Sequence, residues 1–92
     1  MESDLKGSKK TNMKNLEKLI NAFNESLDIP VLKINDDLEY GYVGWDSIAH
    51  MALIAEIEES FDIMIDTDDV IDMSSFAKAK EIVKKYGVDL DA

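Results

Sequence analysis

The chain has 92 residues and no cysteine, and its 20 acidic residues against 10 lysines give a formal net charge of −10. This length permits one small domain, and the lack of cysteine excludes disulfides, thiolate metal sites and a protein thiol nucleophile. The acidic field argues against nucleic acid as a partner, and because no apolar run reaches membrane-spanning length we expect a cytoplasmic protein.

Residues 1–12 are rich in lysine and serine and carry few apolar side chains, so we expect a disordered N-terminal arm there. We predict the folded domain over residues 13–87 and a frayed tail over residues 88–92. The function is therefore expected to reside in the central segment.

The first predicted helix spans Met13 to Leu27, because apolar residues recur there at helical spacing. Thr11 or Asn12 is its expected N-cap, and Pro30 disfavours continuation of the helix. The residues expected to face inward are Leu16, Leu19, Ile20, Phe23 and Leu27.

A long loop is predicted over residues 28–46, where no hydrophobic period persists and Pro30, Gly41 and Gly44 interrupt the chain. Such a loop is unusual in a small domain unless it is functional or packs its own side chains. The side chains that could pin it to the core are Val31, Ile34, Leu38, Tyr40, Tyr42 and Val43.

The second predicted helix begins near Ser47, runs to Ser60, and carries two apolar groups. A helical wheel places the first group on one stripe that should face the core, namely Leu53, Ile54, Ile57 and Phe61. The second group lies beside Ser47 between Glu58 and Glu59, and it consists of Ile48, Met51 and Ala55. This second group either forms an exposed apolar patch rimmed by carboxylates or widens the core-facing stripe.

A short third helix is predicted with Thr67 as its cap, followed by a fourth helix capped by Ser74 or Ser75 and ended by Gly87. The inward residues of the fourth helix should be Phe76, Ala79, Ile82 and Val83. No strand-period alternation is long enough to build a sheet. The sequence thus predicts an all-α four-helix bundle with three longer helices, a short third helix and a long first loop.

Ser47 stands where the long loop turns into the second helix, in the sequence Gly44-Trp45-Asp46-Ser47-Ile48. Its hydroxyl could simply cap the helix, but Asp46 competes for that role. If Asp46 is the cap, the hydroxyl of Ser47 is free in the first turn. A phosphodiester would suit that position, because unpaired N–H groups and about half a positive charge gather at a helix N-terminus.

These residues resemble the acyl carrier protein family, whose signature is Gly-x-Asp-Ser-Leu/Ile at the start of the second helix. The matching positions are Gly44, Asp46, Ser47, Ile48, the Glu58-Glu59-Ser60-Phe61 ending, and then Ile63, Met64, Ile65 and Asp68. The resemblance covers about residues 13–86. It implies that Ser47 carries a covalent 4′-phosphopantetheine derived from coenzyme A. It also implies that basic partner enzymes dock on an apolar patch of Ile48, Met51 and Ala55, with Asp46, Glu56, Glu58 and Glu59 steering them.

On this resemblance the protein is expected to be a monomeric, non-enzymatic carrier, and its partners are a phosphopantetheinyl transferase and acyl-loading and acyl-transfer enzymes. It would hold acyl intermediates as thioesters in fatty acid, polyketide or another dedicated biosynthesis. An aminoacyl, peptidyl or D-alanyl carrier would use the same serine attachment site and is one alternative. An unmodified acidic helical interaction module is another. Trp45 and Ala52 depart from the best-known fatty-acid carriers and indicate a specialised carrier.

Three other groups of residues could carry chemistry. His50 lies one helical turn after Ser47, but a Ser–His nucleophile pair needs an orienting acid and a shielded pocket, so we expect His50 to border the core. The aspartates near Asp66 and Asp68 lack the spacing of a calcium-binding loop, so no dedicated metal site is expected. Trp45, Tyr40 and Tyr42 either stack on a ligand or anchor the loop, and we favour anchoring.

Overall fold

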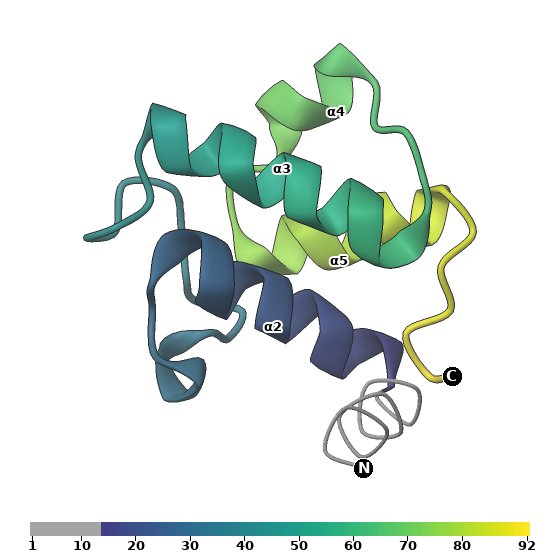
Figure 1. The fold of residues 1–92 in the computed structure, drawn as a ribbon, viewed down its shortest axis with the longest axis horizontal. Helices are drawn as coiled ribbons and strands as arrows, with labels where there is room; N and C mark the ends of the chain where they lie inside the picture. The colour runs from purple at the N-terminus through teal and green to yellow at the C-terminus, as the bar shows by residue number, and fades with distance from the viewer. Residues whose placement is uncertain (1–13) are drawn as a thin grey trace, which may run out of the picture.

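The computed structural model describes residues 14–92, and it contains four α-helices and one turn of 3₁₀-helix over that range. These are α2 (Asn15–Leu27), η1 (Val31–Lys33), α3 (Ser47–Phe61), α4 (Thr67–Asp72) and α5 (Phe76–Lys85) (Figure 1). The only β-type pairing among the described residues is one isolated bridge between Glu39 and Ser75. The predicted all-α fold with three longer helices and a short third one is confirmed. The predicted arm over residues 1–12 and the predicted caps Thr11 and Asn12 lie outside the described residues.

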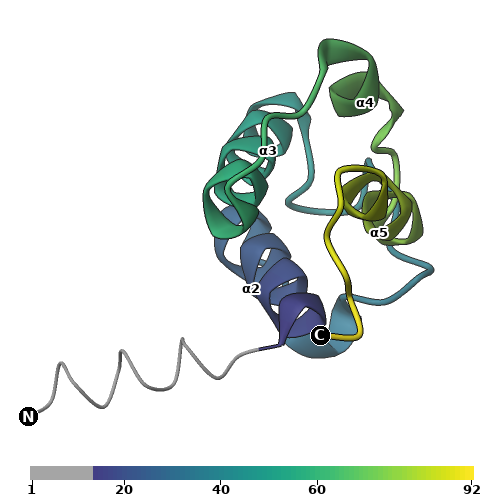
Figure 2. The same cartoon turned by 90° about the vertical axis from the view of Figure 1, so that its right-hand side faces the viewer.

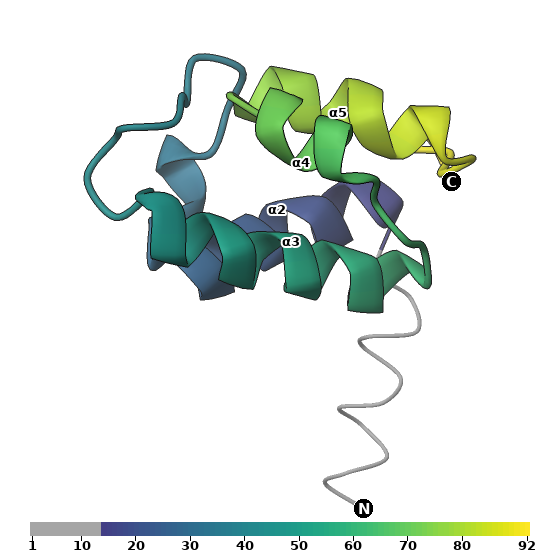
Figure 3. The same cartoon turned by 90° about the horizontal axis from the view of Figure 1, so that it is seen from above.

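The helices enclose one core. α2 and α3 pack against each other and run in opposite directions, as Figures 1 and 3 show. Seen nearly along these helices in Figure 2, α5 lies across from them and α4 crosses at the top. No helix among residues 14–92 combines the length and apolar character needed to span a membrane.

Phe23 of α2 stands at the centre of the core. Its ring makes edge contacts with Trp45 and Phe76, with centroid separations of 5.4 Å and 5.1 Å. The inward residues predicted for α5 are all buried. Of those predicted for α2, Leu16 is a correction, because its side chain lies at the surface and the core is closed by residues further along the helix.

The long loop between α2 and α3 is held at few points. Ile34 and Leu38 are buried as predicted, and the backbone of Tyr40 donates to the Ser74 carbonyl at 2.9 Å. Of the other predicted anchors, Val31, Tyr42 and Val43 are exposed, which corrects that prediction. Tyr40 is 48% exposed, but its ring packs edge-on against Trp45 and His50.

The helix ends follow capping chemistry. The Asp46 carboxylate accepts from the Ala49 N–H at 2.9 Å, and the Ser75 hydroxyl accepts from the Lys78 N–H at 3.0 Å. Asp66, and not the predicted Thr67, occupies the N-cap of α4. α5 ends in a Schellman arrangement, in which Gly87 has a φ of 94° as the predicted helix stop requires.

Residues 88–92, expected to fray, fold back along the start of α2. Val88 and Leu90 pack against the core. The Asn15 side chain donates to the Asp89 carbonyl at 2.8 Å, and the Asn15 backbone donates to the Ala92 carbonyl at 3.1 Å. The two ends of the described chain thus lie together, away from the start of α3 (Figure 3).

Candidate functional site

Ser47 is the first residue of α3, and its side chain is exposed. Because Asp46 caps the helix, the Ser47 hydroxyl takes part in no hydrogen bond within residues 14–92. The His50 N–H donates to the Asp46 carbonyl at 2.8 Å, so the amides of Ser47 and Ile48 remain as the open donors of the first turn. The alternative in which Ser47 itself caps the helix is excluded. An anion bound to its oxygen would sit at the positive end of a long helix.

Gly44 allows the loop to deliver Ser47 to this position. Its φ is 97°, and a Cβ atom there would lie 2.7 Å from the Leu27 carbonyl oxygen at the end of α2. Trp45 follows at once and is 1% exposed, so the chain is anchored two residues before Ser47. The glycine of the motif is thus required both for its backbone conformation and for close approach to α2.

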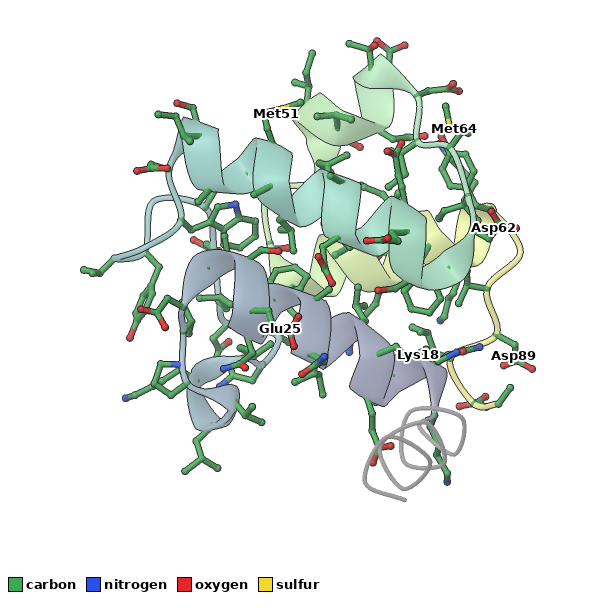
Figure 4. The ribbon with its side chains drawn as sticks, in the orientation of Figure 1. Lys18, Glu25, Met51, Asp62, Met64 and Asp89 are labelled. Atoms are coloured by element: carbon green, nitrogen blue, oxygen red, sulfur yellow. The ribbon has the colours of Figure 1, made fainter. Side chains whose placement is uncertain are left out.

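A groove of about 390 Å³ opens beside Ser47 between α3, α4 and the link from α4 to α5. Its lining is mostly apolar and includes three residues that carry hydroxyl groups. The lining residues are Tyr40, Ser47, His50, Met51, Val70, Ile71, Met73 and Ser74. Figure 4 shows Met51 extending from α3 on the side of α4. A larger hollow of about 580 Å³ between α2, α5 and the tail shares no residue with this groove and has a charged lining, which includes Lys80, Lys84 and Asp91.

The apolar group predicted beside Ser47 lies at the surface. Ile48 is 83% exposed, Met51 is 57% exposed, and Ala55 is exposed. The alternative in which these residues widen the core is therefore excluded. Ile71 of α4 is 76% exposed and also lines the groove, but sequence reasoning did not connect it to this face, because α4 is too short to show a period.

The carboxylates on α3 differ in what they contact. Glu59 is exposed and Glu56 is half-buried. Glu58 is also half-buried, and its carboxylate accepts from the Ile65 N–H at 2.8 Å. That bond holds the link between α3 and α4, so Glu58 has a structural contact that sequence reasoning missed. The sequence offers no signal for it, because the partner is a backbone group in an irregular segment.

His50 is not a base for Ser47. Its Nδ1 accepts from the Trp45 indole N–H at 2.9 Å, and its Nε2 lies 2.8 Å from the Val70 carbonyl oxygen. Both ring nitrogens are therefore occupied, which excludes the Ser–His pair. His50 borders the core as expected, and Trp45 anchors the loop instead of stacking on a ligand.

A second polar cluster ties α4 to the end of α5. Asp69 is buried, and its carboxylate accepts from Lys85 Nζ and from the Tyr86 hydroxyl, both at 2.6 Å. The Tyr86 oxygen in turn accepts from the Asp66 N–H at 2.9 Å. The hydrogen bonds from Lys85 and Tyr86 lower the pKa of Asp69, and the bond to Asp69 raises the pKa of Lys85.

Asp69 is thus committed to protein partners. Over residues 14–92, no three histidine or carboxylate side chains converge in a way that could hold a metal ion. The acidic residues near α4 are therefore best described by their contacts with α5 and by their surface charge.

Comparison with protein families matches residues 17–83 to the model described as Phosphopantetheine attachment site. A search of curated proteins returned no match, and neither did a search of solved structures. The matched range begins within α2 and ends within α5, so it contains Ser47 and the groove. Because it spans well over half of the chain, the protein belongs to the phosphopantetheine attachment site family, whose members are non-catalytic carrier domains that hold a covalent 4′-phosphopantetheine on a serine.

Proposed function

We propose that the protein is an acyl carrier protein in which Ser47 holds the 4′-phosphopantetheine arm and α3 presents the cargo to partner enzymes. The observation that carries this proposal is the exposed, unpaired hydroxyl of Ser47 in the first turn of a helix capped by its neighbour Asp46. A modifying enzyme can reach such a hydroxyl without unfolding the domain.

The other serines of the described chain fit the role less well. The Ser75 hydroxyl caps α5 by accepting from the Lys78 N–H. Ser26 is half-buried, and its hydroxyl is directed at the Ala52 carbonyl. Ser60 is half-buried in the last turn of α3, where a helix end carries negative charge and disfavours a phosphate. Ser74 is exposed but precedes the cap of α5 and lies outside any helix. Ser47 alone among these combines exposure with a long helix N-terminus.

The residues around Ser47 fit the group. The unpaired amides of Ser47 and Ile48 belong to the same first turn as the Oγ that would carry the phosphodiester, at the positive end of α3. The apolar groove, with Tyr40 and Ser74 in its lining, suits a chain that alternates methylene and amide groups. The arm supplies a terminal thiol for thioester linkage, which this cysteine-free chain lacks. The chain's own part is to fix the arm's attachment point and to present a docking surface.

The docking surface proposed for partner enzymes is the exposed face of α3. Ile48, Met51 and Ala55 form its apolar centre, and the carboxylates of Glu56 and Glu59 give it the charge that steers a basic patch. Asp46 and Glu58 add to this field, although both carboxylates also hold backbone groups. The cytoplasmic location and the monomeric state stay predictions.

Modification of Ser47 is tested by intact mass. Apo protein incubated with a broad-range phosphopantetheinyl transferase and coenzyme A should gain one phosphopantetheine, and Ser47→Ala should gain none. Ser74→Ala is the matched control, since Ser74 lines the same groove and is exposed. It should gain one as the wild type does. Addition to Ser47→Ala would reject the assignment, and a wild type that stays unmodified would favour the unmodified interaction module.

The class of cargo is tested by loading. The modified protein is offered to acyl ligases with fatty acids, and to amino-acid-activating enzymes, including one for D-alanine. Acyl transfer to the arm with no aminoacyl transfer supports the proposal. Preferential aminoacyl loading would replace it with an aminoacyl, peptidyl or D-alanyl carrier.

A further inference from the structure

Trp45 and His50 form a buried hydrogen-bonded pair that ends on the backbone of α4. The Trp45 Nε1–H donates to His50 Nδ1 at 2.9 Å, and His50 Nε2 lies 2.8 Å from the Val70 carbonyl oxygen. An indole nitrogen only donates, so Nδ1 must accept, and the proton of the neutral imidazole must then be on Nε2. A single tautomer of His50 thus satisfies all three groups.

This pair has little access to substitute partners. Trp45 is 1% exposed and His50 is 9% exposed, so water cannot readily replace either bond. The two rings are nearly parallel, at 21°, and the ring of Tyr40 meets the imidazole edge-on with centroids 5.7 Å apart. The imidazole is therefore held in orientation by aromatic contacts as well as by hydrogen bonds.

α4 depends on such contacts for its position, because a helix of six residues is not stable by itself. Asp69 joins it to α5 through Lys85 and Tyr86. On the side of the groove, the bond from His50 to Val70 is the one side-chain hydrogen bond that joins α4 to α3 within the described chain. Met51 of α3 and Val70 of α4 both line the groove, so this bond joins the two helices that border it.

We propose that His50, oriented by Trp45, is a positioning residue that holds α4 at the distance from α3 at which the groove receives the arm attached to Ser47. The inference rests on the proposed function, since it concerns that arm. It assigns to the tryptophan before the Asp-Ser pair, and to the histidine one turn after it, a joint role in shaping the groove instead of roles in chemistry.

The experiment follows NMR signals of the full chain before and after modification by a transferase and coenzyme A. The reporters are the methyl groups of Met51, Ile71 and Met73 and the indole N–H of Trp45, which is the only tryptophan. In the wild type, attachment of the arm should shift all four signals. In His50→Phe, which keeps a ring but has neither donor nor acceptor, these shifts should be lost although the arm is still added.

Two further variants separate positioning from general stability. His50→Gln retains an acceptor and a donor on one side chain and should recover part of the shifts. Ile82→Val removes one methylene from the core of α5 without touching the bonds that join Trp45, His50 and Val70, and should keep the wild-type shifts. Loss of the shifts in Ile82→Val, or no recovery in His50→Gln, would overturn the positioning role.

Trp45→Phe removes the indole donor but keeps an aromatic ring, although a smaller one, at this core position, and it covers the case in which His50→Phe does not fold. It should lose the methyl shifts as well, and their persistence in either Phe variant contradicts the inference. A wild type that gains the arm while its groove signals stay in place also overturns the inference but leaves the proposed function intact. A wild type that gains no arm refutes the proposed function itself.

Discussion

Gly44 decides whether the loop can place Ser47 at the surface. A Cβ atom at Gly44 would lie 2.7 Å from the Leu27 carbonyl oxygen, while at Gly41, whose φ is also positive, nothing lies within 4 Å. We expect Gly41→Ala and Gly44→Ala each to lower the free energy of unfolding by roughly 1–2 kcal/mol, because alanine is strained in the left-handed backbone conformation. Gly44→Ala should lose about 1–3 kcal/mol more because the chain must move away from α2.

Urea unfolding followed by circular dichroism checks this difference. Gly41→Ala serves as the matched control, because it shares the positive φ without the close contact. If the two variants lose equal free energy of unfolding, the chain can move away from α2 at little cost, and Gly44 is needed only for its backbone conformation.

Asp69 should make stability depend on pH in the acid range. Its pKa is lowered in the folded protein by hydrogen bonds from Lys85 and Tyr86, so its contribution is fully present above the unfolded value of 3.8 and is lost as the pH falls through the folded pKa. The difference in unfolding free energy between wild type and Asp69→Asn should therefore be largest near neutral pH and shrink below about pH 4. A difference that is constant from pH 7 to pH 3 would contradict the lowered pKa.

The helices could be predicted from the sequence, but the contacts between them could not. Apolar spacing predicted the buried faces of α2, α3 and α5, since each is long enough to show a period. The same wheel placed Ile48 and Met51 beside Ser47 but left open whether they form an exposed patch or widen the core, and only the structure shows that they are exposed. Bonds such as that from His50 to Val70 join residues twenty positions apart, and no local pattern encodes them.

Glu58 and Glu59 allow a carboxylate that stabilises the fold to be compared with one that only contributes surface charge. The Glu58 side chain accepts from the Ile65 N–H, whereas the Glu59 side chain is exposed and makes no hydrogen bond within the described chain. Glu58→Ala should lower the unfolding free energy by about 1.5–3 kcal/mol, as expected for a bond to a charged acceptor. Glu59→Ala should change it by less than about 0.5 kcal/mol.

Thermal and urea unfolding of the two variants provide the measurement. Glu58→Gln is a useful third variant, because its amide oxygen can still accept from Ile65 and should restore most of the stability. If Glu58→Ala and Glu59→Ala prove equally stable, the contact with Ile65 does not hold the link between α3 and α4.

The charge of the whole molecule is distributed unevenly. From residue 34 to residue 77 there is no lysine or arginine. Three lysines of α5 pair with acids of the loop or of α4: Lys80 contacts Asp36 at 2.7 Å, Lys78 contacts Asp72 at 3.4 Å, and Lys85 contacts Asp69 at 2.6 Å. None of these pairs involves α3, so the face around Ser47 keeps its negative charge available for basic partners.

Composition alone predicted an acidic, single-domain chain and excluded thiol chemistry by the protein itself, but it could not locate the site. The short motif around Ser47 predicted where the site lies. It could not predict the geometry of the site, because the exposure of the serine hydroxyl depends on which residue caps the helix. The cap by Asp46 and the core position of Trp45 decide that question only in three dimensions.

The most direct test of the central claim is to locate the arm by peptide mass spectrometry of the transferase-modified wild-type chain. Fragmentation should place one phosphopantetheine on Ser47, within the stretch that follows Gly44 and Trp45, and leave Ser74 and Ser75 unmodified. An arm found on any other serine would contradict the account, because the groove, the Asp46 cap and the Trp45–His50 pair would then surround the wrong residue.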